Sequence, residues 1–162
     1  MLSALRAEDA AEMVVVLSDP SLHEFTGGRP ATHDELAARY ASWVAGSGSD
    51  SELWLNWIVR SRVDCRAIGT LQATVVNPDS DPEAAIAWTI GTPWQRRGFA
   101  TEATTALVVW LAENGIDSIV AYVHPAHAAS AAVARRVGLA PTSEVVDGEV
   151  VWRNRRAGGQ SV

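Results

Sequence analysis

The middle of the chain has an order of elements that limits the fold more than any other stretch. An apolar run over residues 84–90 is typical of a buried strand and stops at Gly91-Thr92-Pro93. An amphipathic run follows as far as Ala112, and a second short apolar run covers residues 118–123. Two consecutive strands of one sheet that are joined through a helix run parallel. The sequence therefore predicts a parallel strand pair inside an α/β fold.

The flanking segments predict antiparallel strands and further helices. Five more runs have strand character, at residues 2–6, 53–60, 66–76, 139–146 and 149–153. Asp147-Gly148, between the last two, is a favoured hairpin turn. Thr32 and Glu35 have the spacing of a capping box, which marks the start of a helix. We therefore expect an α/β (α+β) fold with a mixed, mostly antiparallel sheet of about six to seven strands and about four helices.

Length and composition suit one domain with a true core. The chain has 162 residues, of which 48% are apolar. We expect this domain to cover residues 1–153 and residues 154–162, which contain Gly158-Gly159, to form a disordered tail.

Charge and cysteine usage exclude several classes of function. The net charge of −6 argues against a nucleic-acid partner or an anionic membrane surface, because both need clustered Lys and Arg. No apolar run reaches the length of a membrane span, and residues 1–17 carry too many charges for a signal peptide. The lone Cys65 excludes an internal disulfide and a cysteine zinc cluster. We therefore expect a cytoplasmic enzyme or binding module.

The turn between the first parallel strand and its helix is typical of an anion site. The first N–H groups of a helix have no partner within it, and the helix dipole adds about half a positive charge there. Gly98 allows close approach of the backbone, and Arg96 and Arg97 add donors. The P-loop and the G-x-G-x-x-G patterns are both absent. This turn is either a cradle for a pyrophosphate or an ordinary helix start with two solvated arginines.

Two motifs at a matching separation carry a resemblance to a known family. Gln95-x-x-Gly98-x-Ala100 resembles the acetyl-coenzyme A signature of the GNAT superfamily of N-acetyltransferases. The stretch from His127 to Ser130, followed by a helix that ends at Gly138-Leu139, is similar to the ribosomal-protein N-terminal-acetyltransferase branch of that family. In that branch an asparagine stands at the position of His127, so the donor role of the asparagine is open here.

The resemblance implies a bound acetyl-CoA and direct attack of an amine on its thioester. It implies that the two parallel strands splay apart to admit the pantetheine arm, and that a backbone N–H of the first strand stabilises the oxyanion. It also implies that Ser130 protonates the leaving thiolate, although Ser130 could instead satisfy N–H groups at the start of its helix. The cofactor-binding residues expected on this basis are Thr89, Ile90, Gln95, Arg96, Arg97, Gly98, Phe99, Ala100, Thr101, His127 and Ser130.

The sequence does not identify the general base that would deprotonate the amine. Glu83, Glu24, His23 and His124 are the candidates, and each of them could equally be a solvated or structural residue. His124 and His127 lie three residues apart, but no third ligand has a suitable spacing, so we expect no metal.

Three hypotheses follow for function. The first is an acetyl-CoA-dependent N-acetyltransferase acting on a primary amine, either a small molecule or a protein N-terminus. The second is a non-catalytic acyl-CoA-binding regulatory or interaction domain. The third, a GNAT-type toxin that acetylates aminoacyl-tRNA, is opposed by the acidic charge. The resemblance also allows a homodimer, on which the chain itself is silent.

Overall fold

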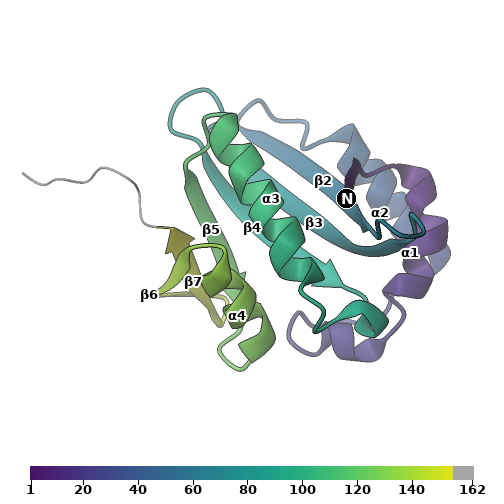
Figure 1. Ribbon diagram of the computed structural model, residues 1–162. Helices are drawn as coiled ribbons and strands as arrows, with labels where there is room; N and C mark the ends of the chain where they lie inside the picture. The colour runs from purple at the N-terminus through teal and green to yellow at the C-terminus, as the bar shows by residue number, and fades with distance from the viewer. Residues whose placement is uncertain (155–162) are drawn as a thin grey trace, which may run out of the picture.

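A seven-stranded sheet forms the centre of the computed structural model, which describes residues 1–154 (Figure 1). The strands are β1 (Leu2–Ala4), β2 (Glu52–Arg60), β3 (Ala67–Val76), β4 (Glu83–Ile90), β5 (Ser118–Val123), β6 (Leu139–Val146) and β7 (Glu149–Asn154). Their order across the sheet is β1-β2-β3-β4-β5-β7-β6, and only the β4–β5 pair of these described strands is parallel. The predicted fold class is confirmed.

Helices cover both faces of the sheet. The longer ones are α1 (Ala10–Val16), α2 (His33–Ala45), α3 (Phe99–Glu113) and α4 (Ala128–Arg136), and the 3₁₀ turns are η1 (Ala7–Asp9), η2 (Pro20–His23) and η3 (Thr92–Trp94). Alternation along β2 separates the two layers, because Ile58 packs with α1 and α2 whereas Val59 packs with α3. Helices α3 and α4 lie side by side on one face, and α1 and α2 lie on the other (Figure 1).

The parallel pair holds together over only a short stretch. Its register joins Glu83 to Ser118, Ala84 to Ile119 and Ala85 to Val120. Strand β4 continues to residue 90 and β5 to residue 123, so the two strands diverge beyond these three pairs. The predicted splay is confirmed, and it opens toward the carboxyl ends of both strands.

Several local predictions match the structure, and a few details differ. The Thr32–Glu35 capping box forms as expected. Trp110 and Val44, two large apolar side chains on α3 and α2, are 41% and 58% exposed. Asn154 ends β7, where its amide accepts the Ile119 N–H at 2.9 Å, so the described domain extends one residue into the predicted tail. The rest of that tail, residues 155–162, lies outside the described residues.

A cluster of ionic contacts fastens the first helical segment to the sheet. The guanidinium of Arg60, at the end of β2, donates to Asp9 at 2.6 Å and to Glu12 at 2.9 Å. The other oxygen of Glu12 accepts the Ala67 N–H at 2.7 Å. The Arg60 side chain is 20% exposed, so water screens these pairs only partly. The cluster ties η1 and α1 to the β2–β3 hairpin.

We predict that Arg60→Ala lowers the free energy of unfolding by about 3 kcal/mol, because it leaves the covered carboxylate of Asp9 and the partly exposed carboxylate of Glu12 without their cation. Urea denaturation followed by tryptophan fluorescence measures this change. Arg66→Ala is the matched control, since the Arg66–Asp64 pair is exposed and should contribute less than about 1 kcal/mol. Equal losses in the two variants would contradict the anchoring role of Arg60.

Candidate active site

The turn after β4 is folded back onto the strand that precedes it. The Gln95 side-chain amide donates to the Ile90 carbonyl at 2.9 Å, which closes the segment containing η3. Gly91 packs so tightly on α1 that an added Cβ would lie 2.8 Å from the Val16 side chain. Gln95, a predicted cofactor contact, therefore also has a structural role, because it shapes the turn.

The start of α3 presents open backbone donors. Arg96 and Gly98 both have left-handed backbone, with φ of 61° and 83°, which is rare for arginine. The first helical hydrogen bond runs from the Glu102 N–H to the Gly98 carbonyl, and no side chain caps the helix. The N–H groups of residues 99–101 are thus left for another partner. No protein atom lies within 4 Å of a Cβ built at Gly98, so the space beside the turn is open.

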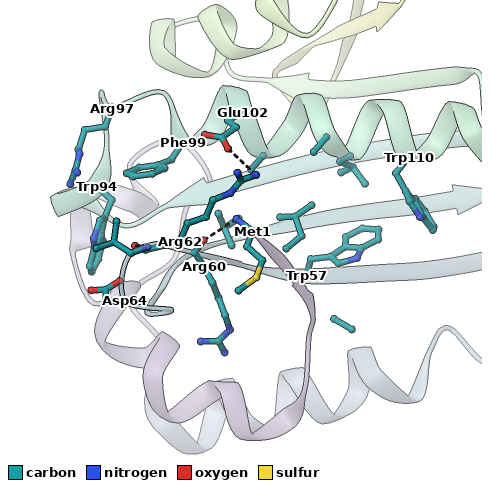
Figure 2. Close-up of a pocket in the computed structure, with 18 residues that line it drawn as sticks. Met1, Trp57, Arg60, Arg62, Asp64, Trp94, Arg97, Phe99, Glu102 and Trp110 are labelled. Atoms are coloured by element: carbon teal, nitrogen blue, oxygen red, sulfur yellow. Dashed lines mark hydrogen bonds and ion pairs between the residues drawn. The ribbon is translucent and has the colours of Figure 1, made fainter.

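The two arginines of the turn are exposed and differ in their contacts. Arg97 places its guanidinium over the Phe99 ring, 5.1 Å from the ring centroid. This contact holds it on the side of α3 that faces β2 (Figure 2). Arg97 is therefore directed beside the helix start and away from β5.

The free edge of β4 is defined by its register with β3. The Gly91 N–H donates to the Ile68 carbonyl of the strand next to it. Because backbone groups alternate in direction along a strand, the N–H and C=O of Thr89 also face β3. Those of Ile86 and Trp88 face the side from which β5 has diverged. Thr89, expected to pair with a ligand through its backbone, is thus turned the wrong way, and Trp88 holds that position instead.

The opposite wall of the opening comes from the end of β5 and the start of α4. His127 is the N-cap residue of α4, and Ser130 lies in its first turn. Phe25, from the loop after η2, reaches across to this wall. Its ring centroid lies 4.4 Å from that of His127 and 5.2 Å from that of His124. The structure thus brings His127 and Ser130 together and adds Phe25, which no sequence motif had indicated.

The candidate general bases have different surroundings. Glu83 accepts hydrogen bonds from Ser118 at 3.0 Å and from Arg153 at 2.6 Å. It is the first residue of β4 and lies at the opposite end of the strand from the turn. His124 accepts the Ala126 N–H at its Nδ1 atom, which holds the loop before α4. Glu83 is therefore a structural residue, and one nitrogen of His124 is already engaged.

A separate cavity of about 790 Å³ lies on the other side of α3 (Figure 2). Trp57 and Trp110 meet edge to face at its apolar end, with centroids 5.6 Å apart. Arg62 and Glu102 form an ion pair of 3.7 Å across its polar end. Its lining includes Arg97 and Phe99, two of the predicted cofactor-binding residues, but no residue of β4 or β5. The cavity therefore adjoins the predicted site only at the start of α3.

Within residues 1–154, no group of acidic, histidine or cysteine side chains could hold a metal ion, and no helix is long and apolar enough to cross a membrane.

A family model described as an acetyltransferase (GNAT) domain matches residues 1–140. The chain belongs to the GNAT acetyltransferase family. This GNAT protein is therefore an acyltransferase that uses acetyl-CoA, as its sequence motifs predicted. No curated protein matches it at the level of sequence.

Solved structures of the same fold cover nearly the whole chain. The aminoglycoside acetyltransferase AAC(6')-Ib in complex with coenzyme A has 18% identity and a TM-score of 0.76, with 97% of this chain and 94% of that one covered. The spermidine N-acetyltransferase from Vibrio cholerae in complex with CoA and spermine has 15% identity, a TM-score of 0.72 and coverage of 94% and 92%. The microcin C7 self-immunity acetyltransferase MccE, in complex with acetyl-CoA and AMP, has 14% identity, a TM-score of 0.74 and coverage of 94% and 90%.

Family membership supports the catalytic hypothesis, and the comparisons give the non-catalytic alternative no support. The structure adds what the motifs could not show. The backbone N–H and C=O of Trp88 face the opening because of strand register, and Phe25 reaches His127 because of loop packing. Neither contact has a signal in local sequence, since each depends on segments far apart in the chain.

Proposed function

We propose that this GNAT protein holds acetyl-CoA across the opening between β4 and β5 and transfers its acetyl group to a primary amine. The observation that carries this proposal is the position of the uncapped start of α3 at the wide end of the splayed strand pair. One end of the opening thus suits an anion, and its edges suit an extended amide chain.

The diphosphate of the donor would lie on the N–H groups of residues 99–101. These groups have no partner in the helix, and the helix dipole favours negative charge there. Arg96, which is exposed beside them, adds a charged donor. Arg97 would contribute only after leaving the Phe99 ring.

The pantetheine arm would pair with the free edge of β4. Ile86 and Trp88 offer their N–H and C=O groups on that side, as an edge strand does to an added strand. Ile90 would contribute its N–H only, because its carbonyl already accepts from Gln95. A backbone N–H of this edge would also be placed to stabilise the oxyanion that forms when the amine attacks.

In the reaction an amide bond forms and the thioester bond breaks. Ser130, half-buried in the first turn of α4, would donate its hydroxyl proton toward the leaving thiolate. His127 would contact the donor from the N-cap position of the same helix.

The acceptor is a primary amine, which is a cation before it reacts. The similar enzymes named above act on aminoglycosides and spermidine, which carry amino groups. The net charge of −6 favours the approach of such cations and disfavours nucleic acid. An exposed unpaired Cys65 fits the reducing cytoplasm, where we place the protein. A homodimer is compatible with this function.

The test is a thiol-release assay with acetyl-CoA and a panel of spermidine, kanamycin and a peptide with a free N-terminus. We expect release of CoA thiol with at least one acceptor and none without an acceptor. Tight acetyl-CoA binding without release for any amine would support the non-catalytic alternative, and no binding at millimolar concentration would refute the proposal.

Gly98→Glu should weaken acetyl-CoA binding by at least about 100-fold, because it adds bulk and negative charge beside the N–H groups of α3. Isothermal calorimetry measures the affinity. Gly115→Glu is the matched control, since Gly115 has a similar left-handed φ of 79° at the other end of α3. Unchanged affinity in the Gly98 variant would refute the placement of the diphosphate.

Ser130→Ala should lower turnover by about 100-fold with little change in acetyl-CoA affinity, because the thiolate would leave without its proton donor. Steady-state kinetics and calorimetry separate the two effects. Ser42→Ala, on the exposed side of α2, is the control for the substitution itself. If turnover of the Ser130 variant equals that of the control, the donor role is wrong.

A further inference from the structure

His127 differs in its surroundings from the other histidines of the chain. It lies where β5 passes into α4, at the N-cap position of the helix. Ser130 occupies the third helical position, so both residues belong to the first turn of α4.

The imidazole of His127 is covered on one side and open on the other. The Phe25 ring packs on it at 4.4 Å between centroids, and the residue is half-buried. Its two ring nitrogens make no hydrogen bond within residues 1–154, although the backbone of His127 does. In the same part of the chain, the unpaired buried side-chain atoms are His23 Nε2, Tyr40 Oη and Thr104 Oγ1, so the nitrogens of His127 reach the surface. They are available to a substrate.

Burial, more than neighbouring charge, favours the neutral form of His127. Burial, chiefly, and the neighbouring His124 lower the pKa of its imidazole below the ordinary value of 6.5, and the carboxylate of Glu24 opposes them only in part. Phe25 brings no charge to the contact. At neutral pH the ring therefore carries a free lone pair.

We propose that His127 is the general base that removes a proton from the acceptor ammonium. This assignment rests on the proposed function. Two of the earlier candidates are less suited, because Glu83 is held by Ser118 and Arg153 and His124 is engaged at Nδ1. Phe25 is a positioning residue that covers the imidazole.

The protons and electrons balance as follows. One ammonium proton passes to the His127 imidazole, and the nitrogen lone pair so released forms the C–N bond to the thioester carbonyl carbon. The C–S bond then breaks, and its electron pair leaves with the sulfur. A second proton from the attacking nitrogen passes through Ser130 to the thiolate. The imidazolium releases its proton to solvent, so each turnover yields an amide, a thiol and one proton.

The test uses His127→Asn, which keeps a hydrogen-bonding side chain that cannot accept this proton. With the best acceptor from the amine panel, we expect kcat/KM at neutral pH to fall by about 100-fold or more. The loss should shrink as the pH rises, because more of the amine is then already neutral. Acetyl-CoA affinity by calorimetry should change much less than kcat/KM, because asparagine can keep a contact with the donor from the same position. His33→Asn, on the exposed start of α2, is the matched control.

A second variant tests the cover over the imidazole. Phe25→Ser should raise the pKa of His127 toward its ordinary value, because the ring becomes solvated. The acid limb of the pH–kcat/KM profile should therefore move to higher pH, with a loss near pH 6 and little change near pH 8. If Phe25→Ser only disturbed the structure, kcat/KM would fall at every pH and the acid limb would stay at the same pH.

Each outcome is decisive. Wild-type transfer with equal activity in His127→Asn, or a loss of that variant confined to acetyl-CoA affinity, overturns the base assignment and leaves the proposed function intact. An acid limb that stays at the same pH in His127→Asn also overturns it. Absence of transfer by the wild-type protein itself would instead refute the proposed function, and the base assignment with it.

Discussion

The site depends on two parallel strands that stop pairing after three residues. Beyond Ala85 and Val120 the backbone groups that would have joined β4 to β5 face an opening. Backbone groups that lack a partner inside a sheet cost free energy. In this fold they become an edge for a ligand, and the start of α3 lies at the same end. Backbone geometry, more than any single side chain, defines this opening and with it the proposed place of the acetyl donor.

The remaining structure keeps this opening in shape from both sides. Arg60 joins the first helical segment to the β2–β3 hairpin, and Gln95 ties the turn to the last carbonyl of β4. Glu83 and Arg153 hold the other end, where β4 still pairs with β5 and β5 pairs with β7. Phe25 then spans the gap between the two halves of the protein. Hydrogen bonds and ion pairs therefore fix the segments on either side of the opening, and the ring contacts of Phe25 with His124 and His127 join the two sides.

Sequence reasoning succeeded where a signal is local. Residues 83–90 and 118–123 form strands with the predicted bounds, Thr32 and Glu35 form their capping box, and the hairpin at Asp147-Gly148 is present. It was less successful where the answer depends on register or on distant segments. The backbone of Thr89 was expected to pair with the ligand, but it faces β3. Glu83 was one of four candidate bases, but Ser118 and Arg153 bind its carboxylate. A one-residue shift along a strand reverses the direction of its backbone groups, and no local pattern reports it.

The sequence by itself determined the fold class, the family and the uncapped turn before α3, because hydrophobic periodicity and backbone-demanding residues such as Gly98 act over short distances. Tertiary structure alone decided which edge of β4 is open, that Glu83 is bound by Arg153, and that Phe25 covers His127. The physical reason is that packing brings together residues about a hundred positions apart, such as Phe25 and His127, and no local sequence pattern reports such a contact.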